Sequence, residues 1–157
     1  MSSFKAVDAR RVVVTGLGSI SPVGNTVKEG WHSILSGLSG ISEISKFDAT
    51  GFAVNIAGEI KNFSISDFVS AKEARHMDTF IHYGIVAGEE AFNDSGYVVS
   101  ESNMEKIGVM VGSGIGGLPM IENTHSVLSE KGPRRVSPFF VPGSIINMIS
   151  GHLSIRL

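Results

Sequence analysis

The chain has 157 residues, of which 42% are hydrophobic and 18% charged, and 13 basic against 15 acidic residues leave a formal net charge of -2. This length fits one ordinary domain, and the composition excludes an intrinsically disordered chain. The near-neutral charge argues against a nucleic-acid-binding protein. Since there is no cysteine, disulfides, thiolate-bound zinc, iron–sulfur clusters and a cysteine nucleophile are excluded within these residues.

The two ends of the chain suggest its location and its completeness. The N-terminus has no apolar run of signal-peptide length, and no segment approaches the roughly 18 continuous apolar residues of a membrane span. We therefore expect a cytoplasmic protein. The last residues continue a helical pattern without the glycine, proline or polar tail typical of a domain edge, which predicts an incomplete domain.

The first part of the chain predicts a strand, a helix and a loop-rich insertion. Residues 11–15 form a short β-branched run that Gly16 ends, as in a buried strand. Thr26 and Glu29 have the spacing of a helix capping box, and the apolar residues that follow share one side of a helix. Residues 39–70 show weak periodicity and many serines and glycines, which predicts a loop-rich insertion with one short strand.

A long helix is predicted over residues 71–94, where apolar residues recur every three or four positions. Gly84 and Gly88 lie within this pattern and reduce its helix propensity. We interpret them as positions where another helix or a sheet packs closely.

The remainder predicts another strand and two helices. Residues 106–111 form the strand, which runs straight into a glycine-rich loop at residues 112–117 and then into a helix. A last, largely buried helix begins at about Gly143. Strands that alternate with helices predict an α/β fold on a mainly parallel sheet. Two strong strands are too few for such a sheet, so the fold is predicted to be incomplete.

The glycine-rich loop has two interpretations. Gly112, Gly114 and Gly117 match the spacing of a dinucleotide-binding fingerprint between a strand and a helix. However, the motif is far from the N-terminal strand, and no acidic residue ends a following strand. A tight backbone crossing beside a buried site is the favoured interpretation, and a dinucleotide-binding domain is the alternative.

The titratable residues do not form a recognisable catalytic or metal-binding motif. None of the histidines has another at metal-ligand spacing; they are His32, His76, His82, His125 and His152. We expect His152 to be a hydrogen-bonded core residue, and Asp78 and Glu73 to be solvated or ion-paired. Neither a metal nor a cofactor is expected.

Lys72 and Arg75 give a small basic face at the start of the predicted long helix. Cations at a helix start oppose the helix dipole, so this placement gains nothing locally. The face is interpreted either as solvated surface or as a docking point for an acidic partner.

Eight segments together resemble the N-terminal part of the bacterial 3-oxoacyl-[acyl-carrier-protein] synthase II family, the elongating condensing enzymes of fatty-acid synthesis. The resemblance runs from about residue 10 to residue 157, in the family's order. The segments are Arg10-Arg-Val-Val-Val-Thr-Gly-Leu-Gly18, Ser21-Pro-Val-Gly-Asn25, Met77-Asp-x-Phe-x-x-Tyr-Gly-Ile-Val-Ala-Gly88, Asp94-Ser-Gly96, Gly112-Ser-Gly-Ile-Gly-Gly117, Gly132-Pro-Arg-Arg135, Ser137-Pro-Phe-Phe-Val-Pro142 and Gly151-His-Leu-Ser-Ile155.

The resemblance implies a thiolase-like fold, in which two similar halves are layered, and a homodimer. It also implies a decarboxylative condensation of an acyl group, held on a cysteine, with malonyl-carrier protein, assisted by two histidines. The chain has no cysteine, and none of its five histidines matches the family's catalytic ones. No catalytic residue is therefore assigned, the C-terminal half is expected to be absent, and the chain alone is expected to be inactive.

The resemblance assigns binding roles to five positions. Ile115 matches the position that limits the depth of the acyl-chain pocket, and Phe140 and Val141 match residues that line the partner subunit's pocket. Lys72 and Arg75 match basic positions that dock the acidic acyl carrier protein. The chain departs from the family in two places: His76 stands where a basic residue is common, and Gly143 stands where serine is usual.

One alternative remains beside the truncated condensing enzyme and the dinucleotide-binding domain: a non-catalytic module for carrier-protein docking or dimerisation. For the isolated chain, we also expect exposed apolar faces and unpaired sheet edges, and hence aggregation or marginal stability.

Overall fold

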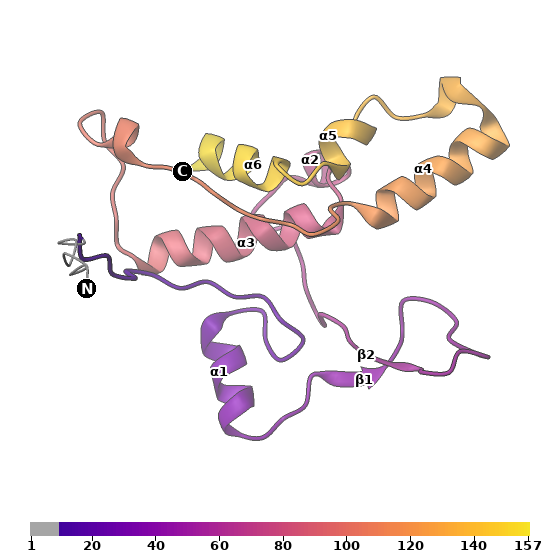
Figure 1. Ribbon diagram of the computed structural model, residues 1–157, viewed down its shortest axis with the longest axis horizontal. Coiled ribbons are helices and arrows are strands. Elements are labelled where there is room, and N and C mark those ends of the chain that lie inside the picture. Colours follow the sequence, from indigo (N-terminus) through magenta and orange to yellow (C-terminus); the bar gives the residue numbers. More distant parts are fainter. Residues whose placement is uncertain (1–9) are drawn as a thin grey trace, which may run out of the picture.

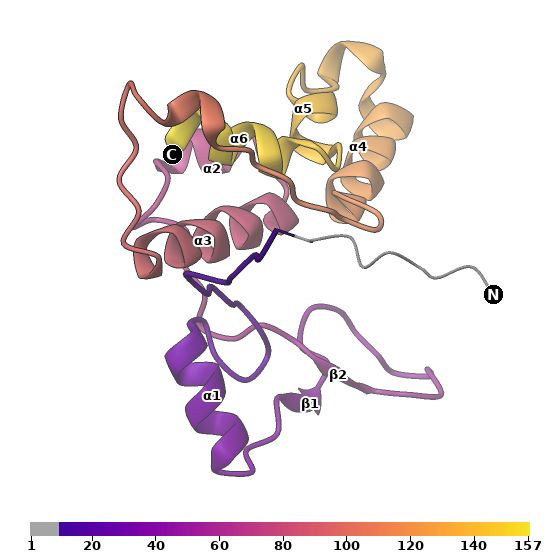
Figure 2. The ribbon, with the colours of Figure 1, turned by 60° about the vertical axis from the view of Figure 1, so that its left-hand side comes forward.

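The computed structural model describes residues 10–157, in which helices outnumber strands. Helix α3 (Thr79–Asp94) lies in the middle, with α2 (Ala71–Ala74) and α6 (Met148–Arg156) along one side of it (Figures 1 and 2). Helix α1 (Val27–Leu35) and the strands β1 (Ile41–Glu43) and β2 (Ile56–Gly58) lie on the other side. The remaining elements are η1 (Met104–Lys106), α4 (Leu118–Lys131), η2 (Pro133–Arg135) and α5 (Phe140–Ser144).

The hydrophobic core is centred on the contact between α3 and α6. Ile81 and Ile85 of α3 are fully buried and pack with Ile149 and Leu153 of α6. A Cβ atom at Gly88 would lie 2.7 Å from Leu153 Cδ1, and one at Gly84 would overlap the side chain of Ile149. The two glycines therefore permit the close helix approach that the sequence predicts.

Local sequence signals explain several helix starts. Glu29 N–H donates to the Thr26 hydroxyl at 3.1 Å, as the capping-box pattern predicts, and the Glu29 carboxylate accepts from Asn25 N–H at 2.8 Å. Ser70 and Glu73 form a complete capping box at the start of α2.

The predicted helix over residues 71–94 is interrupted. Residues 75–78 separate α2 from α3, and Asp78 caps the start of α3. The last helix is divided as well, into α5 and α6. The sequence contains one signal for the start of α3 after this break, because an aspartate before a helical pattern is a common N-cap.

The two predicted strands do not form among the described residues. Residues 11–15 are extended but have no strand partner, and residues 104–106 form a 3₁₀ turn before an extended stretch. A strand exists only when another segment accepts its ladder hydrogen bonds, and no described segment does so here. The pairing that does form is antiparallel, with Ser42 opposite Ala57, so residues 39–70 hold two short strands.

The N-terminal extended segment is held on α3 by side chains. Leu17 N–H donates to Asp94 at 2.9 Å, and Ser19 N–H donates to Glu90 at 2.8 Å. Between these bonds, Gly18 lies so close to the α3 backbone that a Cβ atom would overlap the carbonyl of Ala87.

No helix among residues 10–157 is long and apolar enough to cross a membrane.

Candidate functional site

The glycine-rich loop ends against α5. Gly117 N–H donates to the Ser144 carbonyl at 2.9 Å, and a Cβ atom at Gly117 would lie 2.9 Å from Ser144 Cα. Gly116 has a φ of +82°, in the region that favours glycine. This end of the loop is therefore the tight backbone crossing that the sequence predicts. Gly112 and Gly114 differ, because both face open space.

Asp78 joins this crossing to α3, and the expectation that it is solvated or ion-paired is wrong. Its side chain is buried, and its carboxylate accepts hydrogen bonds from Met120 N–H at 2.8 Å and from Phe80 N–H at 3.4 Å. Its own N–H donates to the Gly143 carbonyl at 3.0 Å. Backbone donors at two helix starts replace the solvent or cation that a carboxylate otherwise requires.

This geometry weighs against the dinucleotide-binding alternative. A bound pyrophosphate would need free N–H groups at the start of α4. The Gly117 and Met120 N–H groups are already bonded to Ser144 and to the Asp78 carboxylate. An anion from the protein itself therefore occupies the helix start.

The structure brings together the segments that carry Ile115, Phe140 and Val141. Ile115 lies two residues before Gly117, and Phe140 and Val141 form the first turn of α5, which ends at Ser144. The Ile115 side chain is 70% exposed and that of Val141 is 56% exposed, whereas Phe140 is half-buried. Ile115 and Val141 thus face outward from the described residues.

Lys72 and Arg75 lie exposed at α2, on the chain just before the turn that contacts α5. The Arg75 Nε–H donates to the Ala71 carbonyl at 3.2 Å. Because α2 is a single turn of four residues, Lys72 lies at its start and its end alike, and it is not at the start of the long helix α3, whose dipole it was expected to oppose. The adjoining His76 ring stacks on Phe139 with ring centroids 3.6 Å apart and planes 6° apart, which links this basic turn to α5.

A groove of about 360 Å³ runs beside α2 and is lined by residues of α2, α5 and α6 and by the turns between them. His152 lines this groove and is half-buried; burial and the Arg156 charge lower the pKa of its imidazole, and Glu73 opposes the shift. The Ser70 hydroxyl, which donates to the Glu73 carboxylate at 2.6 Å, lowers the pKa of Glu73. His152 was expected to be the hydrogen-bonded core histidine. The histidine that makes such a bond is His82, whose Nε2 lies 3.0 Å from the Ala74 carbonyl oxygen.

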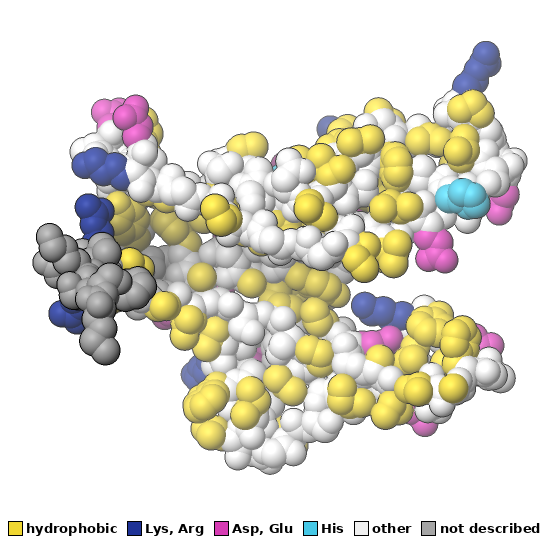
Figure 3. Space-filling view, viewed as in Figure 1, with side chains coloured by type: hydrophobic (Ala, Val, Ile, Leu, Met, Phe, Trp, Pro, Cys, Tyr) yellow, Lys and Arg dark blue, Asp and Glu magenta, His cyan; other side chains and the backbone are white. Residues whose placement is uncertain are grey.

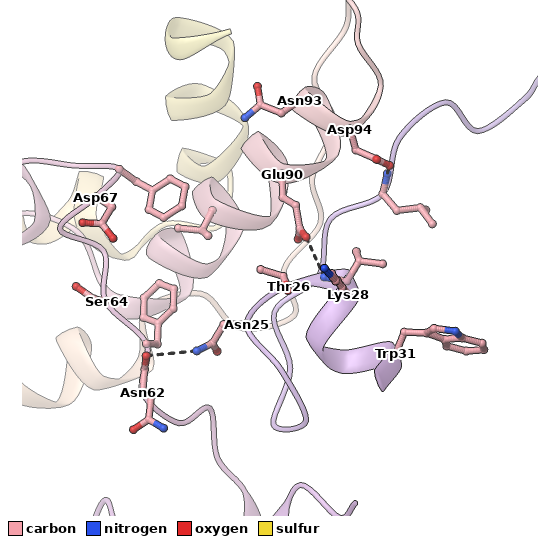
Figure 4. Close-up of a pocket in the computed structure, with 15 residues that line it drawn as sticks. Asn25, Thr26, Lys28, Trp31, Asn62, Ser64, Asp67, Glu90, Asn93 and Asp94 are labelled. Carbon is pink, nitrogen blue, oxygen red and sulfur yellow. Dashed lines mark hydrogen bonds between the residues drawn. The ribbon is translucent and has the colours of Figure 1, made fainter. Parts of the chain in front are cut away.

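A larger cavity, of about 780 Å³, lies on the other side of α3 (Figure 4). It is bordered by the N-terminal loop, α1, residues 62–68 and α3, and the five predicted binding residues lie outside it. Its Glu90 carboxylate accepts from Val27 N–H at 2.9 Å and from Ser19 N–H, so both oxygens hold the loop.

Among residues 10–157, no three His, Asp or Glu side chains gather as a metal site.

The family description "Beta-ketoacyl synthase, N-terminal domain" matches residues 9–157. A 3-oxoacyl-[acyl-carrier-protein] synthase 2 of Vibrio harveyi is 57% identical over 146 residues, which are 93% of this chain and 35% of that protein. The protein of the same name from Staphylococcus aureus strain COL is 49% identical over 148 residues, which are 94% of this chain and 36% of that protein.

Solved structures agree with this result. One solved structure is that of a type II polyketide synthase acyl-carrier protein in complex with its ketosynthase bound to the hexaketide. A chain of this structure matches 92% of the present chain, with a TM-score of 0.74 and 27% sequence identity. The match covers 38% of that chain. The present chain therefore spans a little over one third of the length of the relatives it matches, and it shares their fold over that part.

Proposed function

Since the chain belongs to the beta-ketoacyl synthase family, we propose that it is the N-terminal portion of a condensing enzyme that elongates fatty acyl chains on acyl carrier protein. Its fold is accordingly the N-terminal part of a layered, thiolase-like α/β fold. The observation that carries the proposal is the 57% identity to the Vibrio harveyi enzyme across 93% of the chain.

In the proposed reaction, an acyl group moves from its carrier protein to a cysteine thiolate, and malonyl-carrier protein then loses CO2. The resulting carbanion forms a carbon–carbon bond with the acyl carbonyl, and the cysteine departs as a thiolate. The chain contains no cysteine, so the nucleophile belongs to sequence outside these 157 residues. We also propose that the whole enzyme is a homodimer and that it acts in the cytoplasm.

Within that enzyme, the chain's own residues bind and orient. Ile115 closes the deep end of the acyl-chain pocket, and Phe140 and Val141 line the pocket of the other subunit. Ile115 and Val141 are exposed, which leaves both side chains available for contact with a ligand or a partner subunit. Lys72 and Arg75 dock the carrier protein, and their exposure at α2 supports this.

A condensation assay tests the catalytic part of the proposal. The complete protein encoded by the reading frame that contains this chain is incubated with acyl- and malonyl-carrier protein, and the products are identified by mass spectrometry. We expect a 3-oxoacyl product that is two carbons longer, with one CO2 released, and no product from the 157-residue chain alone. The absence of product from the complete protein, or its formation by the chain alone, would refute the proposal.

The docking role has a matched charge-reversal test. Lys72→Glu combined with Arg75→Glu is expected to slow association with acyl carrier protein about tenfold or more at low salt, because charge complementarity chiefly accelerates encounter. The control reverses two exposed lysines on the other side of α3, Lys46 and Lys61. Equal slowing in both variants would show a net-charge effect and remove the assigned docking face. If the 157-residue chain binds the carrier protein while the complete protein fails to condense, the docking-module alternative is favoured.

A further inference from the structure

The carboxylate of Asp78 does more than cap its own helix. Capping α3 requires one oxygen, which accepts from Phe80 N–H at 3.4 Å. The other oxygen makes the shorter bond, 2.8 Å, to the N–H of Met120, which lies 42 residues away in the first turn of α4. This second bond adds nothing to α3. It fixes the start of α4, and with it the end of the glycine-rich loop.

Backbone hydrogen bonds also join the start of α3 and the end of the glycine-rich loop to the end of α5. The Asp78 N–H donates to the Gly143 carbonyl at 3.0 Å, and Gly117 N–H donates to the Ser144 carbonyl at 2.9 Å. A Cβ atom at Gly117 would lie 2.9 Å from both Asp78 Cβ and Ser144 Cα. Three segments distant in sequence are thus locked together without space for a further atom.

The junction lies directly behind two of the predicted binding segments. Ile115 is two residues from Gly117, and Val141 is two residues from Gly143. The Gly117–Ser144 backbone bond joins the loop to α5, and the Asp78 carboxylate fixes the other end of the same loop by holding the Met120 N–H at the start of α4. The position of the Ile115 loop relative to α3 therefore depends on the Asp78 side chain.

The burial of Asp78 also needs an explanation. Its side chain is 7% exposed, and within residues 10–157 it forms no ion pair. A buried carboxylate costs free energy unless it is fully hydrogen-bonded, and an apolar or hydroxyl side chain would avoid that cost. Each of the two carboxylate oxygens accepts from a different helix start, one from Phe80 N–H in α3 and the other from Met120 N–H in α4.

We propose that Asp78 is a positioning residue that ties the start of α4, and with it the Ile115 loop, to the start of α3 and thereby sets the acyl-chain length that the enzyme accepts. This inference rests on the proposed function, since it assigns a specificity role within the same acyl-chain pocket. Asp78 does not touch the acyl chain; it acts through the loop.

Three variants of the complete protein separate this role from general stability. Asp78→Ser keeps a side-chain acceptor for the α3 cap but is too short to reach Met120. Asp78→Asn keeps the shape but has one acceptor oxygen, so one of the two bonds is lost. Asp94→Asn is the matched control, because Asp94 also accepts a backbone N–H, from Leu17, at the far end of α3.

The readout is the ratio of kcat/KM for the longest and the shortest accepted acyl-carrier substrates. Both Asp78 variants are expected to change this ratio about fivefold or more, the equivalent of one hydrogen bond, whereas Asp94→Asn leaves it within about twofold. An unchanged ratio in both Asp78 variants, or an equal change in the control, would overturn the inference.

Hydrogen exchange of residues 112–121 provides a readout that does not depend on activity. Faster exchange there in the Asp78 variants, and not in Asp94→Asn, is expected if the carboxylate fixes the loop. If the wild-type protein shows no condensation, the proposed function and the specificity role both fail, while the exchange data still decide whether Asp78 positions the loop. If condensation occurs and exchange is unchanged, the positioning role alone is overturned.

Discussion

The α3–α6 contact and the extended segment at residues 12–14 are both apolar in sequence, but their surroundings differ. Ile81 and Ile85 are 0% exposed, whereas Val12 is 89% exposed and Val14 is 79% exposed. The helices meet because Gly84 and Gly88 allow α6 to approach. The segment that follows the valines is held on α3 by hydrogen bonds from the Leu17 and Ser19 N–H groups to the Asp94 and Glu90 carboxylates, which fix the backbone but do not cover the valine side chains. Burial therefore requires an apolar partner as well as apolar residues.

Exposed hydrophobic side chains are also spread across the visible face of the molecule, on both sides of α3 (Figure 3). Such a surface is larger than a monomeric protein normally exposes, and it fits the finding that the relatives are nearly three times as long.

The largest effect is expected in the α3–α6 core. Ile85→Ala should lower the free energy of unfolding by about 2–5 kcal/mol, because a buried side chain is lost and a cavity remains. The matched change Val13→Ala, at a side chain that is 70% exposed, should alter it by less than about 0.5 kcal/mol. Urea unfolding followed by circular dichroism measures both. Equal losses would show that the valine segment is packed in solution.

A smaller loss is expected at the helix crossing. Gly84→Ala places a methyl group against Ile149 and should lower the free energy of unfolding by about 1–2 kcal/mol after the gain in helix propensity. Gly151→Ala is the control, because its nearest neighbour would be Met148 Cε at 3.8 Å. That change should raise stability by about 0.5–1 kcal/mol. Stabilisation by both changes would contradict the close approach.

The exposed segment should promote self-association. Val13→Lys is expected to reduce the concentration dependence of light scattering, since a charge on an unpaired extended segment discourages edge-to-edge pairing. Val13→Ile keeps the segment apolar and should behave as the wild type does. A monodisperse wild-type monomer at high concentration would contradict the expectation.

The smallest effect concerns pH. Burial lowers the pKa of His152 below the usual value of about 6.5, so the unfolded chain binds this proton at a higher pH than the folded chain. The contribution of His152 to stability is therefore present above about pH 6.5 and is lost as the pH falls toward the folded pKa. His152→Gln should flatten this part of the stability curve between about pH 7 and 5. An unchanged slope would show that the imidazole is solvated.

Local features were predictable from the sequence, and non-local ones were not. The Thr26–Glu29 cap and the role of Gly84 follow from spacing along one helix, and the structure confirms both. The predicted strand at residues 11–15 depends on a partner, and no described segment supplies one. The signal for Asp78 was a helix cap, but its bond to Met120 spans 42 residues, and no local pattern contains it.

The candidate site shows the same limit. Ile115, Phe140, Val141, Lys72 and Arg75 were assigned from a family resemblance rather than from the physical chemistry of the sequence. The structure places the loop and helix that carry the first three next to each other, and their binding roles stay predictions.

The central claim is that this chain supplies the end of an acyl-chain pocket in a condensing enzyme, and Ile115→Phe in the complete protein tests it most directly. The measurement is kcat/KM across a series of acyl-carrier substrates, with Ile121→Phe, on the partly exposed face of α4, as the control. We expect Ile115→Phe to lower kcat/KM for the longest substrates about 10- to 100-fold while the shortest are spared, and the control to keep the wild-type profile. Equal values for long and short substrates in the Ile115 variant would contradict the claim.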